Sequence, residues 1–246
     1  MYLTDDEIIA ILLKEKKRKR RRRRVLRRLT CLAVFILILI LGIGLFINRG
    51  VLDTPFNGRG VIFIDPGHGG VDGGSTALGR KEKDDTLALS LVVKEELEEM
   101  GFKVYMSRTD DSDVDRAERG KMANNKHAKL MISIHRNQDD KSEGEGVEIW
   151  IPSDNNKESR LLGENIIAEL EKQGFYNRGV RSGTLVNSKD DYYENSVPTM
   201  PSCIVETGFV SKASDNKLFD SKLKENGKAI AKAIEKTFAS LYETEE

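Results

Sequence analysis

Four side chains in this sequence combine the residue types that metal-dependent hydrolysis needs: His68, Glu82, His135 and Glu206. Two imidazoles and one carboxylate are a ligand set of catalytic zinc, which keeps one coordination position open for water. A second carboxylate can accept the proton of that water, whose pKa zinc lowers from ~15.7 to about 7. Zinc also polarises a substrate carbonyl and stabilises the developing oxyanion. These residue types predict hydrolysis of an amide by zinc-activated water with a glutamate general base. They leave open which glutamate binds the metal.

Each of the four residues stands close to a predicted strand or helix end. His68, His135 and Glu206 come after runs of apolar residues, which are typical of strands buried on both faces. Glu82 follows a glycine-rich loop, 71–81, and precedes a predicted helix. Because ligands bind where parallel strands end, we expect the four side chains near one sheet edge. The simpler alternative is a set of unrelated residues: solvated turn histidines and a glutamate that complements a helix dipole.

The third histidine, His127, is predicted to lie outside this group. It follows Asn124, Asn125 and Lys126 at the polar end of a predicted helix that Asp115 opens as a capping residue. No partner at ligand spacing surrounds His127. We expect a solvated or helix-capping side chain there.

The wider pattern predicts one three-layer α/β domain over residues 61–242. Apolar runs alternate with helical periodicities, which implies a mostly parallel central sheet of about six strands flanked by helices. The alternation at 147–151 predicts a strand with one face fully covered and Glu148 on the other face. A short strand is expected at 184–186 and a closing helix at 221–241.

The first 47 residues predict a membrane anchor. Residues 1–28 hold 12 of the 40 Lys and Arg and 4 of the 40 Asp and Glu, so the rest of the chain has 28 basic and 36 acidic side chains. Residues 29–47 carry no charge, and a helix of this length rises roughly 28 Å, close to the ~30 Å hydrocarbon core of a bilayer. The positive-inside rule then keeps the N-terminus in the cytoplasm and places the rest outside, behind a tether at 48–60.

Two other interpretations of this segment are possible from the sequence. A cleaved signal peptide would have a shorter apolar region and a cleavage site, for which Gly42 to Gly44 is a weak candidate. A nucleic-acid-binding role for the arginine run is disfavoured, because its contact with the apolar segment explains it more simply. We therefore expect a single-pass protein of the cell membrane that contacts the lipid bilayer and no nucleic acid.

Four short motifs make the chain similar to the zinc-dependent N-acetylmuramoyl-L-alanine amidases of the amidase-3 type. They are Asp65-Pro66-Gly67-His68-Gly69-Gly70, Glu82-Lys83-Asp84, Ser133-Ile134-His135 with Asn137, and Val205-Glu206 with Gly208-Phe209. The resemblance implies that His68, Glu82 and His135 bind one Zn²⁺ per chain and that Glu206 is the catalytic glutamate. It also implies that the substrate is peptidoglycan, cleaved at the amide between the lactyl group of N-acetylmuramic acid and L-alanine.

Some positions depart from the family pattern. Arg136 and Gln138 flank the second histidine where small residues are usual, and the segment 187–199 looks longer than typical and could act as a small lid. Two alternatives to the amidase stay open: a catalytically silent wall-binding module, which would not need Glu206, and zinc hydrolysis of a different wall bond. The presence of all four chemical residues favours an enzyme.

Overall fold

The computed structural model of the chain describes residues 58–141 and 143–243. The predicted basic segment (1–28), the membrane anchor (29–47) and most of the tether (48–60) lie outside these residues. Among the residues that are described, no helix is both long enough and apolar enough to cross a bilayer. The anchor and the tether therefore remain predictions from the sequence.

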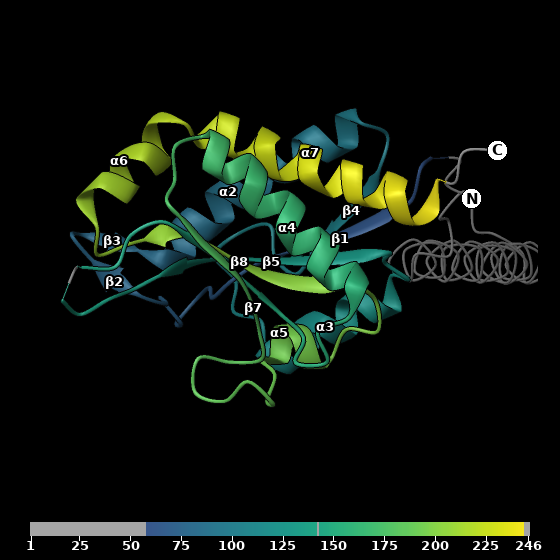
Figure 1. Cartoon of the computed structure of the whole chain (residues 1–246), viewed down its shortest axis with the longest axis horizontal. Coiled ribbons are helices and arrows are strands. Elements are labelled where there is room, and N and C mark those ends of the chain that lie inside the picture. The colour runs from purple at the N-terminus through teal and green to yellow at the C-terminus, as the bar shows by residue number, and fades with distance from the viewer. Residues whose placement is uncertain (1–57, 142, 244–246) are drawn as a thin grey trace, which may run out of the picture. The chain divides into compact units, whose positions relative to one another are not determined.

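A six-stranded sheet forms the middle layer of the described domain (Figure 1). In spatial order its strands are β4 (Lys103–Met106), β1 (Val61–Pro66), β5 (Leu130–Asn137), β8 (Ser202–Phe209), β6 (Val147–Ile151) and β7 (Asn177–Ser182). The first four are parallel, β6 runs antiparallel to β8, and β7 is parallel to β6. The prediction of a mostly parallel sheet of about six strands is confirmed, and β1, β5 and β8 are direct neighbours.

Helices cover both faces of this sheet, which completes the three layers (Figure 1). The helices over one face are α2 (Glu82–Glu99), α4 (Lys157–Lys172) and α7 (Leu223–Tyr242). Those over the other face are α3 (Arg116–Asn125) and the single turn α5 (Tyr193–Ser196). The remaining described elements are α6 (Ala213–Ser221) and a small hairpin of β2 (Thr76–Ala77) and β3 (Arg80–Lys81).

Alternation along β1 explains how one strand serves both faces. Ile62 and Ile64 are fully buried in the large apolar cluster that also contains side chains of α2, α4 and α7. Phe63 points the other way, into a smaller cluster with Ala123 of α3. Burying a side chain of this size contributes roughly 1.5–3 kcal/mol to the free energy of unfolding. Apolar contacts with β1 therefore stabilise both helical layers. The next residue on the α3 face is Asp65, where the environment becomes polar.

The prediction of a strand at 184–186 is wrong. The strand is β7, at Asn177–Ser182, whose side chains are mostly half-buried because it is the edge strand of the sheet. Its polar sequence therefore lacks the apolar run by which interior strands are found. Leu185 and Val186 are 74% and 95% exposed and belong to a loop, where the Thr184 amide donates to the Asn187 carbonyl.

The strand at 147–151 was predicted with one open face, and this is also wrong. All five residues of β6 are buried, including Glu148, which is only 3% exposed. β6 lies between β8 and β7, so both of its edges are paired. The predicted closing helix at 221–241 is confirmed as α7, which begins at Leu223 and is separated from α6 by Lys222.

Candidate metal centre

A strained turn after β1 presents His68. The backbone of His68 adopts a φ of 60°, and Gly69 and Gly70 follow with φ values of 135° and 56°. A left-handed conformation costs a non-glycine residue roughly 1–2 kcal/mol, and such strain concentrates at functional sites. Reciprocal backbone hydrogen bonds between Gly69 and Asp72 close the turn. The Asp72 carboxylate lies 2.8 Å from Nδ1 of His68 and so fixes the ring orientation.

Glu82, the first residue of α2, reaches both histidines. Its Oε1 lies 2.9 Å from Nδ1 of His135, and its Oε2 lies 3.2 Å from Nε2 of His68. The same two oxygens accept hydrogen bonds from backbone N–H groups, Oε1 from Arg136 and Oε2 from Ser75. Glu82 is 2% exposed. A buried carboxylate with four such neighbours has one defined position.

Two glycines leave the space that these side chains occupy. A Cβ atom on Gly74 would lie 2.6 Å from Cδ2 of His68 and 2.7 Å from Oε2 of Glu82. A Cβ atom on Gly67 would overlap the ring of His135. The glycine-rich sequence around the first histidine is therefore required by close packing around the three side chains.

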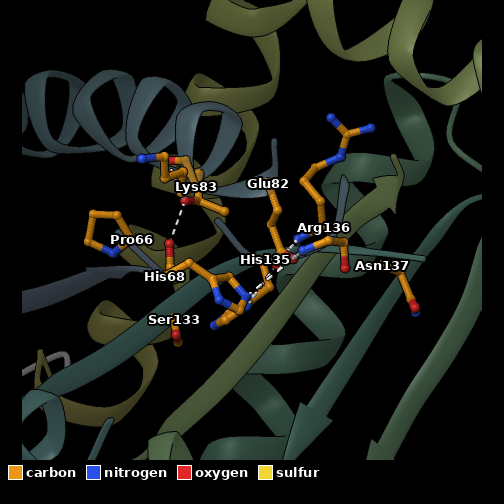
Figure 2. A network of polar contacts seen from close by, with 12 residues as sticks. Pro66, His68, Glu82, Lys83, Ser133, His135, Arg136 and Asn137 are labelled. Carbon is orange, nitrogen blue, oxygen red and sulfur yellow. Dashed lines mark hydrogen bonds and ion pairs between the residues drawn. The ribbon is translucent and has the colours of Figure 1, made fainter. Parts of the chain in front are cut away.

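His135 completes the group from the middle of the sheet. β5 continues through His135 to Asn137, so the histidine lies within the strand and not after it as the apolar run suggested. The rings of His68 and His135 are 5.0 Å apart and nearly perpendicular. The potential ligand atoms of His68, Glu82 and His135 all lie within 4.8 Å of one another (Figure 2). Within the described residues, Nε2 of His135 is buried without a hydrogen-bond partner.

Glu206 stands beside this group on the neighbouring strand. It pairs with His135 in the β5–β8 ladder, so the two side chains share a face of the sheet. Its Oε2 is also buried without a hydrogen-bond partner among the described residues. Burial raises the pKa of Glu206 to about 7, against the attraction of His135, and the negative charges of Glu82 and Glu148 add to the increase. Glu206 and the two histidines line one cavity of about 190 Å³.

The electrostatics of the group are dominated by Glu82. Burial lowers the pKa of His135, but the hydrogen bond and charge of Glu82 outweigh it and raise that pKa to about 9. Burial opposes the charge of Glu82 as well, yet its bonds to His135 and His68 hold the pKa of the carboxyl well below its ordinary value. The site therefore favours positive charge next to Glu82.

These observations fit a divalent cation. Two imidazoles and a carboxylate supply borderline nitrogen and hard oxygen donors, which suit zinc. The buried Nε2 of His135, which has no partner among the described residues, is a donor atom that a metal would satisfy. A cation would also take over the role of the protons that Glu82 stabilises on the imidazoles. His68, Glu82 and His135 are the residues that could hold it.

The structure also reveals residues that sequence reasoning overlooked or left unexplained. Asp72 orients His68, and only its place in the glycine-rich loop four residues later could have suggested this. Arg136 is 1% exposed and donates to Asp85 at 2.5 Å and to Asn216 at 2.7 Å. It thereby ties β5 to α2 and α6, which explains a position noted only as a departure from the family pattern. His127 is exposed just after α3, with a φ of 52°.

Comparison with known proteins agrees with this geometry. The sequence profile of the Amidase_3 family, described as N-acetylmuramoyl-L-alanine amidase, matches residues 62–236. The chain belongs to this family, and its class is that of the N-acetylmuramoyl-L-alanine amidases, which act on peptidoglycan.

Three proteins illustrate the relationship. YqiI of Bacillus subtilis is 36% identical over 163 residues, covering 65% of this chain and 75% of YqiI. The N-acetylmuramoyl-L-alanine amidase LytC of Bacillus subtilis is 34% identical over 176 residues, which are 71% of this chain but only 33% of LytC. The structure of the N-acetylmuramoyl-L-alanine amidase AmiC2 of Nostoc punctiforme superposes with a TM-score of 0.65 at 30% identity, covering 73% of this chain and 97% of AmiC2.

Proposed function

We propose that this chain is a zinc-dependent N-acetylmuramoyl-L-alanine amidase in which His68, Glu82 and His135 hold one Zn²⁺ and Glu206 is the general base. The bond hydrolysed is the amide between the lactyl group of N-acetylmuramic acid and L-alanine of the stem peptide. One observation carries the proposal above all. His135 and Glu206, paired on adjacent strands, each have a buried polar atom without a partner in the described part of the chain, directly beside Glu82 and His68.

The chain's own residues divide the work of hydrolysis. Zn²⁺, when bound, supplies Lewis acidity to the attacking water and to the substrate carbonyl. Glu206 accepts a proton from the attacking water through its carboxylate and returns it to the departing amino group of L-alanine. Asp72 holds the tautomer and orientation of His68 through Nδ1, and the amides of Ser75 and Arg136 hold the carboxylate of Glu82. The rigid strands β5 and β8 keep His135 and Glu206 in register.

We further propose that the protein is anchored in the cell membrane through residues 29–47. The N-terminus would be cytoplasmic and the amidase domain outside, where the wall lies. The support is the uncharged segment beside a run of arginines. A reporter enzyme active only outside the cytoplasm, fused after residue 246, tests the orientation. Activity of the reporter is the expected result, and a reporter that works only inside contradicts it.

The activity is tested with the detergent-solubilised full chain and purified peptidoglycan. Mass spectrometry should find new muramic lactyl carboxylates paired with new L-alanine amino groups. Cleavage inside the peptides would instead identify a hydrolase for a different wall bond. Binding without cleavage would identify a silent wall-binding module. A metal analysis of the same sample should find one zinc per chain, and loss of zinc in His135→Ala ties the metal to this site.

A further inference from the structure

A second cavity, of about 270 Å³, adjoins the candidate metal centre. Both cavities are lined by Glu206 and Tyr192, so these two side chains form a shared wall. The first cavity contains the histidines. The second contains no residue of the metal group and is lined instead by Arg178 and Arg181 of β7. A substrate reaching past Glu206 therefore passes from the metal group to a pair of guanidinium groups.

A buried glutamate forms ion pairs with these two arginines. Glu148, 3% exposed, faces Glu206 in the β6–β8 ladder. Its Oε1 lies 2.6 Å from Nε of Arg181 and 3.6 Å from Nε of Arg178, and its Oε2 accepts a hydrogen bond from Asn137 at 3.3 Å. One carboxylate is shared between two cations, so Glu148 alone does not neutralise Arg178 and Arg181, although Glu206 and Asp139 also line this cavity.

Aromatic rings add a second restraint on the arginines. The guanidinium of Arg181 lies 5.7 Å from the ring of Trp150, and that of Arg178 lies 5.1 Å from the ring of Phe209. Cation–π contacts at these distances favour one orientation of each guanidinium. Both arginines are thus positioned before any substrate binds, which reduces the entropy lost on binding.

The terminal nitrogens of these arginines are the free part of the cluster. Among the described residues, those of Arg181 have no hydrogen-bond partner, and Arg178 reaches only the carbonyl of Glu145 at 3.5 Å. The side chains are 45% and 28% exposed, respectively. The nearby Asp139 does not compete, because its carboxylate accepts from the backbone N–H groups of its own loop. Guanidinium groups whose Nε side is paired with Glu148 and whose terminal N–H groups are largely free are suited to a carboxylate.

We propose that Arg178 and Arg181, positioned by Glu148, form a subsite for a carboxylate of the substrate's stem peptide. The inference rests on the proposed function and extends it to substrate specificity. In that substrate the lactyl carboxyl group is already part of the amide, so a carboxylate close to the scissile bond comes from the peptide. Arg181 is the main contact, because its terminal nitrogens are free and its side chain is the more exposed. Glu148 is a positioning residue that does not touch the substrate.

Two muramoyl peptides of identical sequence test this subsite, one with a free carboxylate on the peptide and one with a carboxamide there. The zinc-loaded full chain should cleave the carboxylate form with a kcat/KM about 10- to 100-fold higher, the range for a hydrogen bond to a charged group. Arg181→Gln should raise KM for the carboxylate form by a similar factor, change kcat little, and leave the carboxamide form unaffected. Arg181→Lys should recover only part of the loss, because lysine keeps the charge without the fork.

Controls separate the subsite from folding and from the reaction itself. Arg160→Gln removes a half-exposed arginine of α4, which pairs with Glu164 at 3.7 Å and donates to Asn155, and it should change kcat/KM for neither substrate. Direct titration of the carboxylate peptide into the Glu206→Gln chain should show about 10- to 100-fold weaker binding once Arg181→Gln is added.

Equal cleavage of both substrates by the unmodified chain overturns the subsite but not the amidase. Equal loss on both substrates in Arg181→Gln shows a structural role. No cleavage of either substrate by the unmodified chain, with peptide binding still dependent on Arg181, overturns the proposed function alone. Tighter binding of an inorganic phosphate or wall phosphate polymer than of the peptide overturns the assignment to a peptide carboxylate.

Discussion

Two buried polar groups contact β5 at positions two residues apart. They differ in whether their buried polar atoms all have hydrogen-bond partners. At Ser133 the strand faces Asp65 of β1, whose carboxylate accepts from Ser133 at 2.6 Å, Ser107 at 2.5 Å and Arg119 at 2.8 Å. At His135 the strand faces Glu206 of β8, and each of these side chains keeps a buried atom without a partner among the described residues. The first group is satisfied by the protein alone, whereas the second is not.

The complete group supports the incomplete one. Arg119 also donates to the carbonyls of Pro66 and His68, at 2.7 and 2.8 Å, and so holds the strained turn. Arg108 donates to the carbonyls of Gly67 and Lys83, which join that turn to α2. A buried polar group with all partners present serves the fold, whereas one that lacks partners beside a candidate ligand set fits the binding of an ion or a water. Substitutions in the two groups should therefore affect different measurements.

The largest effect is expected from Glu206→Gln. An amide of nearly the same shape cannot accept the proton of the attacking water, so turnover should fall by ~10²- to 10⁴-fold. The free energy of unfolding should not decrease, because the change removes a buried carboxylate whose pKa is already raised to about 7. Turnover on peptidoglycan, urea unfolding and zinc content measure this together, with zinc expected to stay near one per chain. Unchanged turnover would remove Glu206 from the mechanism.

Asp65→Asn should act on stability. It leaves the guanidinium of Arg119, 3% exposed, without its buried counter-charge, which typically costs ~3–5 kcal/mol. Urea unfolding monitored by circular dichroism measures the loss. The matched control is Glu118→Gln on α3, the helix that carries Arg119, which breaks an exposed pair with Lys121 and should leave the urea unfolding midpoint nearly unchanged. Equal losses of stability in the two variants would show that the buried hydrogen bonds and ion pair of Asp65 do not stabilise the fold.

The pH dependence of stability gives a smaller and graded effect. Burial opposes ionisation of Asp65, but Arg119, Ser107 and Ser133 outweigh it and lower its pKa below the ordinary value. A lowered folded-state pKa contributes stability that is fully present above the unfolded pKa of ~3.9 and is lost as pH falls through the folded pKa. The difference in unfolding free energy between the unmodified chain and Asp65→Asn should narrow below about pH 4, by ~1.4 kcal/mol for each pH unit. A constant difference from pH 2 to 7 contradicts this.

Much of the fold was predictable because interior parallel strands are continuous apolar runs. The runs before His68, His135 and Glu206 placed three strands correctly, and their neighbouring order followed from alternating strands and helices. The Asp115 cap of α3 was also predicted correctly, and its carboxylate accepts from the amides of Ala117 and Glu118. These features are local in sequence or follow from general rules of topology.

Other features depend on register and edges, which the sequence does not express locally. β7 is polar because it is an edge strand, whereas the apolar residues that suggested a strand, Leu185 and Val186, lie in an exposed loop. The charge on Glu148 suggested an exposed face, but its partners are arginines on a neighbouring strand whose position was mispredicted. The chemical assignment of His68, Glu82, His135 and Glu206 stays a prediction, although the structure brings these residues together.

The smallest effect is expected at the third histidine. This substitution tests whether zinc binding needs the buried group or only the presence of a histidine. His127 is exposed, follows the helix that carries Arg119, and belongs to neither buried group. His127→Ala should leave the zinc content measured by mass spectrometry unchanged, and the free energy of unfolding should shift by about 0.5 kcal/mol or less, as for most surface positions. His135→Ala should lose the metal in the same assay, because it deletes a donor atom that has no other described partner. Loss of zinc from the His127 variant would mean that an exposed imidazole, not the incomplete buried pair, marks the metal site.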